Sequence, residues 1–386
     1  MSHSSSTPFT VDNIPFGVIS TNDNPNPRCA TALGHDAIDL SALESDGFFD
    51  AIPEFCDKSI FSKPYLNDFA GFFIESRRQA RHLLRGSLLQ LREDETQAHR
   101  YFIALSRVKG YYPMQTNNFS DFYCSQEHAQ NLHSSPKLHH CKDESLNVET
   151  TLTRPHGVFK DDVGEYTFTP TKKSDMELEM GVFISKPLIP GQVLDIKNVA
   201  DHIFGFVILT GFGTSISPWI VTMDALAAVK SAVMIKQDPG PLPHLTWKGN
   251  DGDATLDIHL PAHSLRNEKL YDFTETNLNE LYWTPFQQLT HLDSAGEGLT
   301  TGDIFGTGTI SSARVNADGE KVGLACLVER SLPHTSLSCL KEDGILWFED
   351  GDEVIMEGFC TNKATGCYFG FGQCRTTNTP AVKLDL

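Results

Sequence analysis

The segment at 174–184, SDMELEMGVFI, alternates between apolar and acidic residues from 176 to 180. In an extended strand its apolar side chains at even positions share one face, whereas Glu177 and Glu179 project together from the other. Two carboxylates on one face are typical of a half-buried strand with its polar side in water. They would also suit a divalent cation that prefers hard oxygen ligands. The pattern predicts a strand and leaves both interpretations of the glutamates open.

Further short runs of β-like composition follow, and turn signals such as GNDGD and EDGDE separate them. These runs lie at 203–209, 255–260, 306–311, 344–348, 352–360 and 367–374. The glycine-rich run at 306–311 contains β-branched residues, which favours a strand over a phosphate-binding loop. Because the predicted strands outnumber the predicted helices, the pattern indicates a β-rich α+β fold.

The first third of the chain combines short strands with one long helix. The runs IPFGVIS and CATALGHDAIDL predict strands on either side of a turn-rich segment at 21–28. Helical spacing from 71 to 108 predicts a helix with its arginines mostly away from the apolar face. That face comprises Phe73, Ala80, Leu83, Leu84 and Leu88. We expect an amino-terminal domain at 1–115 and a second domain at 116–386.

Two other segments have distinct patterns. The sequence NLNELYWTPFQQLTHL predicts a helix that begins at an Asn277 cap and carries Leu281, Gln288 and Leu292 at helical spacing. Pro285 within it implies either an early first turn or a kink. The stretch at 133–151 has few apolar residues and mixed charges, which predicts an irregular loop.

The composition is that of a globular protein with an acidic surface. The formal net charge of −19 argues against nucleic acid or an anionic membrane as a partner. The nine cysteines include no CxxC pair, so neither a zinc pattern nor a secreted disulfide framework is indicated. The amino terminus lacks the pattern of a signal peptide, and no apolar run reaches the ~18 residues of a membrane helix. We expect a reduced, cytoplasmic protein.

A second polar cluster, SDFYCSQEHAQN at 120–131, contains Asp121, Tyr123, Glu127 and His128. Such residues occur in many polar helix starts and loops. The same set would also supply a metal-binding carboxylate and an imidazole base that titrates near neutral pH. Motifs for other mechanisms are absent, since the sequence has no GxSxG, no GxxxxGK(S/T) and no strand-linked GxGxxG.

Several segments together resemble the fumarylacetoacetase family, in the same order along the chain. They are SDFYCSQEHAQN, DMELEMGVFI, HIFGFVIL, FGTSISPWIV, KQDPGPLP, LYWTPFQQLTH, GTGTIS, EDGDEVIMEGFC and FGFGQC, preceded by IPFGVISTNDNPNPRCATALG. The resemblance covers most of the chain, and the combination of DMELEM with SDFY and EH is distinctive. It implies that Asp121, Glu177 and Glu179 bind Mg²⁺ or Ca²⁺. It further implies that His128 is the general base and that Glu329, in CLVER, orients it.

The resemblance also implies a substrate, a fold and an assembly. The substrate would be a small diketo acid, 4-fumarylacetoacetate, hydrolysed to fumarate and acetoacetate in tyrosine and phenylalanine catabolism. Tyr123 and Thr309 would contact it. A small SH3-like β-barrel domain would precede a β-roll catalytic domain, and the protein would be a homodimer.

Two blocks typical of the family have no counterpart in this chain. After HIFGFVIL, Thr210 and Gly211 lead directly into FGTSISPW, so a fourth metal carboxylate, a lysine, an arginine and a glutamine are missing. The stretch at 133–151 replaces a Gly-Tyr-His-Gly-Arg-like segment. Three alternatives follow: a fumarylacetoacetase that has lost internal segments, a catalytically impaired homologue acting as an interaction or regulatory subunit, or a hydrolase or decarboxylase of another keto acid.

Overall fold

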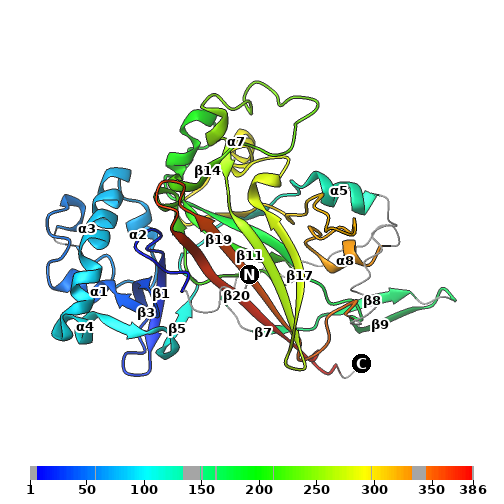
Figure 1. Ribbon diagram of the computed structural model, residues 1–386, viewed down its shortest axis with the longest axis horizontal. Coiled ribbons are helices and arrows are strands. Elements are labelled where there is room, and N and C mark those ends of the chain that lie inside the picture. Colours follow the sequence, from blue (N-terminus) through cyan, green and yellow to red (C-terminus); the bar gives the residue numbers. More distant parts are fainter. Residues whose placement is uncertain are drawn as a thin grey trace.

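Two sheet-containing parts lie side by side in the computed structural model, which describes residues 7–56, 58–133, 148, 151–160, 163–211, 213–296, 298–332 and 345–384 (Figure 1). The amino-terminal part carries one sheet and the longest helix of the described residues, at Ile74–Glu93. The larger part carries two further main sheets. The chain is therefore a mixed, sheet-rich α+β protein, as the sequence pattern predicts.

The amino-terminal sheet is antiparallel and has the strand order β4-β3-β2-β1-β5. Its strands are β1 (Phe16–Thr21), β2 (Arg28–Leu33), β3 (Asp36–Asp39), β4 (Phe102–Ala104) and β5 (Val108–Tyr111). The run CATALGHDAIDL forms both β2 and β3, because Gly34 adopts a φ of 70° and the chain turns there. The helices are α1 (Leu40–Ser45), α2 (Asn67–Ala70), α3 (Ile74–Glu93) and α4 (Glu95–Tyr101), with 3₁₀ turns η1 (Pro53–Phe55) and η2 (Leu105–Arg107).

The long helix expected at 71–108 is divided into α3 and α4, and its apolar face differs in part from the prediction. The positions buried as expected include Ala80, Leu84 and Leu88. Phe73 precedes the helix and is 74% exposed. The prediction that the arginines avoid the core is wrong for Arg81, which is buried and donates to the Asn13 carbonyl at 2.7 Å. Because backbone carbonyls satisfy the guanidinium, its apolar stem can pack inside.

A six-stranded sheet, with the order β12-β11-β10-β18-β6 and with β13 paired to β11, lies at the centre of the molecule. Its strands are β6 (Phe119–Asp121), β10 (Glu177–Ile184), β11 (Ile203–Gly211), β12 (Ser215–Ile216), β13 (Val221–Thr222) and β18 (Ile304–Gly306). The strand predicted from SDMELEMGVFI is confirmed as β10. Met180 and Val182 pack in the core of the larger part, whereas Phe183, on the opposite face, packs against the amino-terminal part. Both faces are therefore covered.

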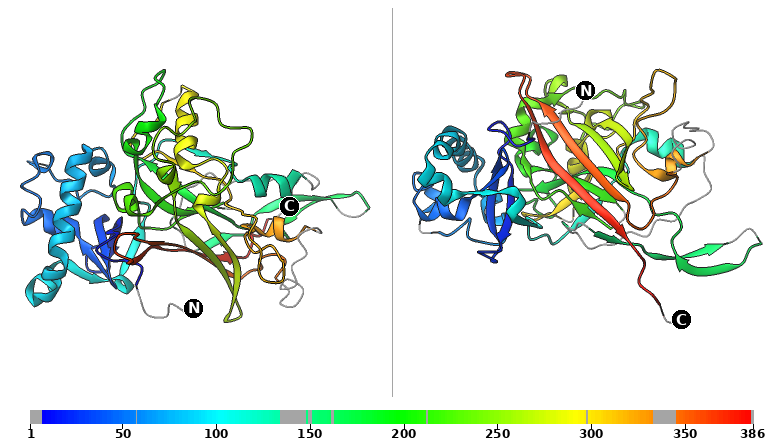
Figure 2. Two further views of the ribbon diagram at one scale, coloured as in Figure 1. Left: turned by 45° about the horizontal axis from the view of Figure 1, so that its top comes forward. Right: turned by 60° about the horizontal axis from the view of Figure 1, so that its bottom comes forward.

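The third main sheet has the order β17-β16-β19-β20-β7 and crosses the larger part (Figure 1). Its strands are β7 (Thr151–Thr153), β16 (His259–Arg266), β17 (Lys269–Asn277), β19 (Glu353–Thr361) and β20 (Tyr368–Thr379). Two small ladders join β14 (Lys230–Ser231) to β15 (Thr255–Leu256) and β8 (His156–Lys160) to β9 (Tyr166–Pro170). The β8–β9 hairpin extends away from the rest of the molecule (Figure 2).

The helix expected from Asn277 is instead two short elements. Asn277 caps a 3₁₀ turn, η6 (Leu278–Glu280), and the α-helix α7 (Pro285–Ser294) starts afresh at a Thr284 cap. Pro285 occupies the first turn, where its missing N–H costs nothing, so it starts α7 rather than kinking a longer helix. The other helices of this part are α5 (Gln126–His133), η3 (Ile196–His202), α6 (Met223–Leu226), η4 (Ala227–Val229), η5 (Asp251–Asp253) and α8 (Leu327–Arg330).

Three predicted strands are corrected by the structure. Only Gly306 of the run at 306–311 belongs to a strand, because Gly308 adopts a φ of 74° and breaks the extended path. The run at 255–260 is divided between β15 and β16. Within 345–348, Phe348 forms only an isolated bridge with Ser174.

The loop expected at 133–151 lies mostly outside the described residues. Of that stretch, His133 ends α5 and Thr151 starts β7. In the described ranges, no helix has both the length and the apolar character needed to cross a bilayer.

Candidate active site and metal centre

Adjacent strands of the central sheet place two acidic side chains together. β6 runs parallel to β18, with Asp121 opposite Gly306, and β18 also pairs with β10, which carries Glu179. A Cβ atom built on Gly306 would lie 2.6 Å from Asp121 Oδ1 and 3.0 Å from Glu179 Oε2. The two carboxylates therefore converge over a position that has no side chain, and any larger residue there would separate them.

Glu177 lies on the same strand as Glu179, as the first residue of β10. It pairs with Gly211 of β11, and a Cβ on Gly211 would lie 2.0 Å from Glu177 Oε2. Glu177 is 7% exposed and Glu179 is 0% exposed. The interpretation of these glutamates as a water-facing polar stripe is therefore wrong. Buried carboxylates need compensating charge or hydrogen bonds, so the protein or a bound cation must supply partners at this face.

These carboxylates fit a hard cation in chemistry and burial. Mg²⁺ and Ca²⁺ take oxygen ligands, and Asp121, Glu177 and Glu179 present only oxygens from rigid strands. Glu177 stands apart, since in the described part of the chain the three do not form a group with all ligand atoms within 4.8 Å of one another. The structure thus brings Asp121 and Glu179 together and leaves Glu177 as the outer member of an open arrangement.

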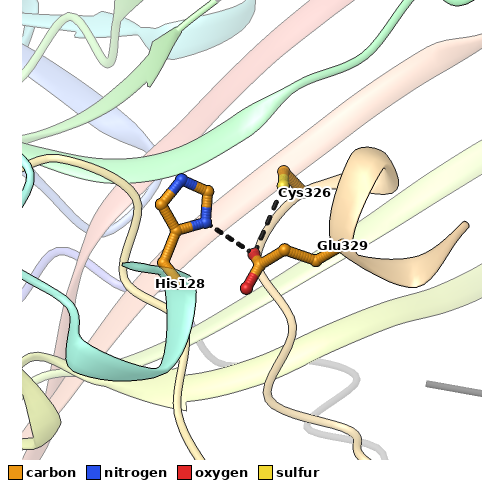
Figure 3. A group of neighbouring side chains, drawn as sticks. All are labelled: His128, Cys326 and Glu329. Atoms are coloured by element: carbon orange, nitrogen blue, oxygen red, sulfur yellow. Dashed lines mark hydrogen bonds and ion pairs between the residues drawn. The ribbon is translucent and has the colours of Figure 1, made fainter. Parts of the chain in front are cut away.

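A buried imidazole–carboxylate pair forms the second half of the site (Figure 3). His128, on α5, is 2% exposed, and its Nδ1 lies 2.9 Å from Oε2 of Glu329, a fully buried residue on α8. Burial lowers the pKa of His128, but its contact with Glu329 and the charges of Glu329, Glu177 and Asp175 raise it above the ordinary value. The site therefore favours the imidazolium form more than water does.

Glu329 receives several contacts besides that of His128. Ser311 Oγ donates to Oε2 at 2.6 Å, Asn131 Nδ2 donates to Oε1 at 2.9 Å, and Cys326 Sγ donates to Oε2 at 3.2 Å. Burial raises the pKa of Glu329, but hydrogen bonds from His128, Asn131 and Ser311 lower it below its ordinary value overall. Glu329 is therefore held as a carboxylate with its orientation fixed.

The ligand atoms of His128, Cys326 and Glu329 lie within 4.8 Å of one another. Burial and the neighbouring carboxylates of Glu329 and Asp175 raise the pKa of the Cys326 thiol well above its ordinary value. A metal ligand would have to be the thiolate. The arrangement therefore suits a hydrogen-bond network around Glu329 better than it suits a metal centre.

Asp175 connects the strand that carries the glutamates to the helix that carries Glu329. Its side chain is buried, and its two oxygens accept the backbone N–H groups of Leu327 at 2.5 Å and Val328 at 2.8 Å. These are the first two residues of α8. Burial raises the pKa of Asp175 to about 7, although these hydrogen bonds oppose the shift. Glu177 also bridges Cys326 through the backbone, so both halves of the site share one local framework.

Tyr123 and Thr309 are placed differently from each other. The Tyr123 ring contacts the His128 ring edge-on, with 4.9 Å between centroids, and its side chain is about half exposed. Burial raises the pKa of Tyr123 to about 12, with further contributions from Glu329, Cys326 and Glu177. Thr309 is buried in the segment that follows β18, beside Ile310, whose N–H donates to Leu178 of β10. The structure brings Tyr123 to His128, whereas Thr309 lies buried in the segment that packs on β10.

Some residues of the site were not predicted from the sequence. Asn131 lies three positions after His128, and this helical spacing was the only signal that the two side chains share a face. Ser311 and Asp175 both lie in segments that resemble the family. Each makes hydrogen bonds that hold Glu329 or α8, and a serine or an aspartate in a sequence does not by itself indicate such a role. The roles of Gly306 and Gly211 could not be predicted from the sequence. Each matters because it has no side chain, which leaves space for a neighbouring carboxylate.

Comparison with known proteins gives a consistent result along the chain. A family model described as Fumarylacetoacetase N-terminal matches residues 12–113, and one described as Fumarylacetoacetate (FAA) hydrolase C-terminal matches residues 209–377. Fumarylacetoacetase from Arabidopsis thaliana is 32% identical, with 97% of this chain and 96% of the relative covered. Fumarylacetoacetase from Bos taurus is 33% identical, with 97% of both chains covered.

A solved structure, maleylpyruvate hydrolase from Sphingobium sp. SYK-6, is similar with a TM-score of 0.48 and 14% identity, over 95% of this chain and all of the other. The alignment with the Arabidopsis relative spans 416 positions, which exceeds the 386 residues of this chain. The relative therefore contains segments that this chain lacks.

Proposed function

Because this chain belongs to the fumarylacetoacetase family, we propose that it hydrolyses a carbon–carbon bond of 4-fumarylacetoacetate, yielding fumarate and acetoacetate. The structural observation that supports this most directly is the buried contact of 2.9 Å between His128 Nδ1 and Glu329 Oε2. It lies beside buried acidic residues of the central sheet. A base with its orienting carboxylate is the minimum machinery for activating water.

In the proposed reaction, His128 removes a proton from water. Its Nδ1 faces Glu329, so the tautomer with a proton on Nδ1 leaves the Nε2 lone pair to act as the base. The hydroxide adds to the keto carbon of the fumaryl group, and the bond between that carbon and the neighbouring methylene breaks. The methylene carbon then takes a proton from the His128 imidazolium, and acetoacetate leaves. Glu329 stabilises the imidazolium between these steps, and general-base catalysis of this kind contributes about 10²- to 10⁴-fold.

Asp121, Glu177 and Glu179 would hold the divalent cation, Mg²⁺ or Ca²⁺. When bound, such an ion would polarise the keto oxygens of the substrate and offset the charge that develops on them. Tyr123 stands at the edge of His128 with its hydroxyl toward the helix, where it would orient the substrate. Thr309, in the segment after β18, would make a second substrate contact.

The finer features of the family form part of the same proposal. They are an SH3-like barrel at 1–115, a β-roll at 116–386, a homodimer, a cytoplasmic location and a role in tyrosine and phenylalanine catabolism. The β8–β9 hairpin supports the homodimer, since Val158 and Phe168 pair across it and are 71% and 49% exposed.

One observation favours a second candidate, a catalytically impaired homologue that acts as an interaction or regulatory subunit. β11 ends at Gly211 opposite Glu177, and the next described residues lead within a few positions into β12. The segment between β11 and β12 is therefore too short to contain the block that supplies a fourth carboxylate and a lysine in the family. A different keto acid as substrate is the remaining alternative.

Hydrolysis of fumarylacetoacetate by the purified full chain, with Mg²⁺ or Ca²⁺ added, tests the proposal. We expect measurable turnover that is abolished in His128→Ala and retained in His202→Ala. His202 is a suitable control because it is also a buried histidine, and its Nδ1 contacts the Lys186 carbonyl instead of a carboxylate. A parent chain that binds the cation but shows no turnover would contradict the hydrolase and support the second candidate.

A further inference from the structure

The loop at 312–325 joins the segment after β18 to α8 and folds back on itself. Val322 N–H donates to the Arg314 carbonyl at 2.9 Å, and Asn316 N–H donates to the Glu320 carbonyl at 2.9 Å. These bonds run between the outgoing and the returning limb, as in a hairpin. The loop therefore has a defined backbone, and the side chains on its returning limb have fixed starting points.

Contacts with neighbouring elements hold this loop in place. The Val322 carbonyl accepts from the N–H of Glu275 at 3.2 Å and from Oγ1 of Thr274 at 3.1 Å, both on β17. On the outgoing limb, Arg314 Nε donates to Glu280 Oε1 at 2.8 Å. Both limbs are thus tied to other parts of the chain, which fixes where the loop lies.

Lys321, on the returning limb, reaches from the loop to helix α5. Its Nζ donates to Oε1 of Glu127 and, at 3.2 Å, to Oδ1 of Asn131. These two residues are one helical turn apart, so they lie on the same side of α5. The Lys321 side chain is only 32% exposed, and the carboxylate of Glu127 compensates its charge. Lys321 therefore holds α5 to the loop at two positions.

Asn131 connects Lys321 to the proposed base. Its Oδ1 accepts from Lys321, while its Nδ2 donates to Oε1 of Glu329 at 2.9 Å. The other carboxylate oxygen of Glu329 lies 2.9 Å from His128 Nδ1 (Figure 3). A reversed Asn131 amide would set its oxygen against the carboxylate and its NH₂ group against the ammonium group. The bond from Lys321 therefore determines that the Asn131 nitrogen points at Glu329.

We propose that Lys321 is a positioning residue for the hydrolysis, because it holds Glu329 through Asn131 in the orientation that aligns His128. This rests on the proposed hydrolase activity and adds to it a residue that lies in none of the segments carrying the resemblance to the family. Without the ammonium group, the Asn131 amide can rotate and Glu329 Oε1 loses a fixed donor. The fraction of molecules with an aligned imidazole then falls.

Turnover of 4-fumarylacetoacetate by the full chain with Mg²⁺ tests this role in Lys321→Met, which keeps most of the side-chain length and removes the ammonium group. We expect kcat to fall roughly 3- to 10-fold, the value of one hydrogen bond, with KM within about twofold. Lys321→Arg, which keeps the charge and the donors, should retain most of the parent kcat. Lys230→Met is the matched control, because Lys230 is also partly exposed and pairs with Asp253. An unchanged kcat in Lys321→Met would overturn the proposal.

A double-mutant cycle separates positioning from a direct effect of the lysine charge. If Lys321 acts through Asn131, Lys321→Met should cause no further loss of kcat in an Asn131→Leu background. Equal losses of kcat in the parent and in the Asn131→Leu background would overturn the proposal.

NMR needs no turnover and separates this inference from the proposed function. In protein labelled with ¹⁵N-histidine, the Nδ1–H signal of His128 is identified by its loss in His128→Ala. We expect this proton to exchange with solvent roughly 3-fold faster or more in Lys321→Met, and at the parent rate in Lys321→Arg and Lys230→Met. An unchanged exchange rate in Lys321→Met would overturn the proposal. A faster rate in Lys321→Met with no turnover by the parent would support the positioning role and contradict the hydrolase.

Discussion

At the residue scale, Glu329 organises the proposed base. Its Oε2 receives contacts from His128, Ser311 and Cys326, and its Oε1 accepts from Asn131. A carboxylate with all these partners cannot rotate without breaking several hydrogen bonds. It therefore fixes both the ring orientation and the tautomer of His128.

Replacing Glu329 by glutamine should move the pH dependence of turnover. Burial lowers the pKa of His128, but Glu329 raises it, and the net shift is above the ordinary 6.5. Because the base must be neutral, the acidic limb of kcat/KM should lie above pH 6.5 in the parent. Glu329→Gln removes the negative charge, so the limb should move to lower pH while turnover falls by about 10²-fold. An acidic limb that stays at the same pH in Glu329→Gln would contradict the pairing of Glu329 with His128. The control is Glu44→Gln, in the amino-terminal part, which should leave the limb unchanged.

Asp175 holds the start of α8, the helix that carries Glu329, and we infer that it positions Glu329 against His128. Replacing Asp175 by asparagine should therefore change the catalytic properties that depend on His128. Each oxygen of Asp175 accepts an N–H at the start of α8. Asparagine would set an NH₂ group against one of these N–H groups, so α8 and Glu329 should shift. We expect kcat to fall about 10-fold with KM little changed, together with a displaced acidic limb. Asp293→Asn, another buried carboxylate that accepts a backbone N–H, should leave the limb unchanged.

At the scale of elements, the proposed cation site depends on a strand that contributes none of its carboxylates. β18 separates β6 from β10, and its Gly306 lets Asp121 and Glu179 approach each other across it. Gly306→Ala would place a methyl group 2.6 Å from Asp121 Oδ1. Since these contacts are below van der Waals distance, the carboxylates must separate.

We therefore expect Gly306→Ala to weaken Ca²⁺ or Mg²⁺ binding at least 10-fold in calorimetric titration. The matched control is Gly86→Ala in α3, where an added Cβ meets nothing within 4 Å. That variant should bind the cation normally and gain about 0.5–1 kcal/mol of unfolding free energy, because alanine is a better helix former. Equal cation affinity in the two variants would show that the carboxylates do not converge on a metal.

The strands and helices of the larger part show which structural features could be predicted from the sequence. The alternation in β10 predicted its strand and put both glutamates on one face, because these properties are local. Pro285 left two outcomes open, and the Thr284 cap decided between them. The approach of Asp121 to Glu179 could not be predicted from local pattern, since it depends on the parallel pairing of two remote strands. The resemblance to the family identified Asp121 and Glu179 as candidate ligands, but it did not show how the two side chains are arranged.

At the scale of the whole molecule, the β8–β9 hairpin extends away from the other described elements (Figure 2). Val158 and Phe168 face each other across the two strands and are both exposed. A two-stranded hairpin is marginal alone in water, so cover from a second copy of the chain would stabilise it. Val158→Lys combined with Phe168→Lys should therefore shift the protein from dimer to monomer in light scattering. Thr167→Lys, at an exposed position on the other face, is the control, and an unchanged mass in the double variant would exclude the hairpin from the interface.

The pairing of β6 with β18 also determines when the site can form during synthesis. Asn117, next to β6, donates to Asp303, next to β18, across 186 positions of the chain. At roughly 5–20 residues per second, a ribosome needs about 10–40 s to make the intervening stretch. Until then Asp121 has no neighbouring strand on that side, and Glu177 and Glu179 have emerged without it. A growing polypeptide therefore cannot assemble the complete set of carboxylates proposed to hold the cation until most of the chain has been translated.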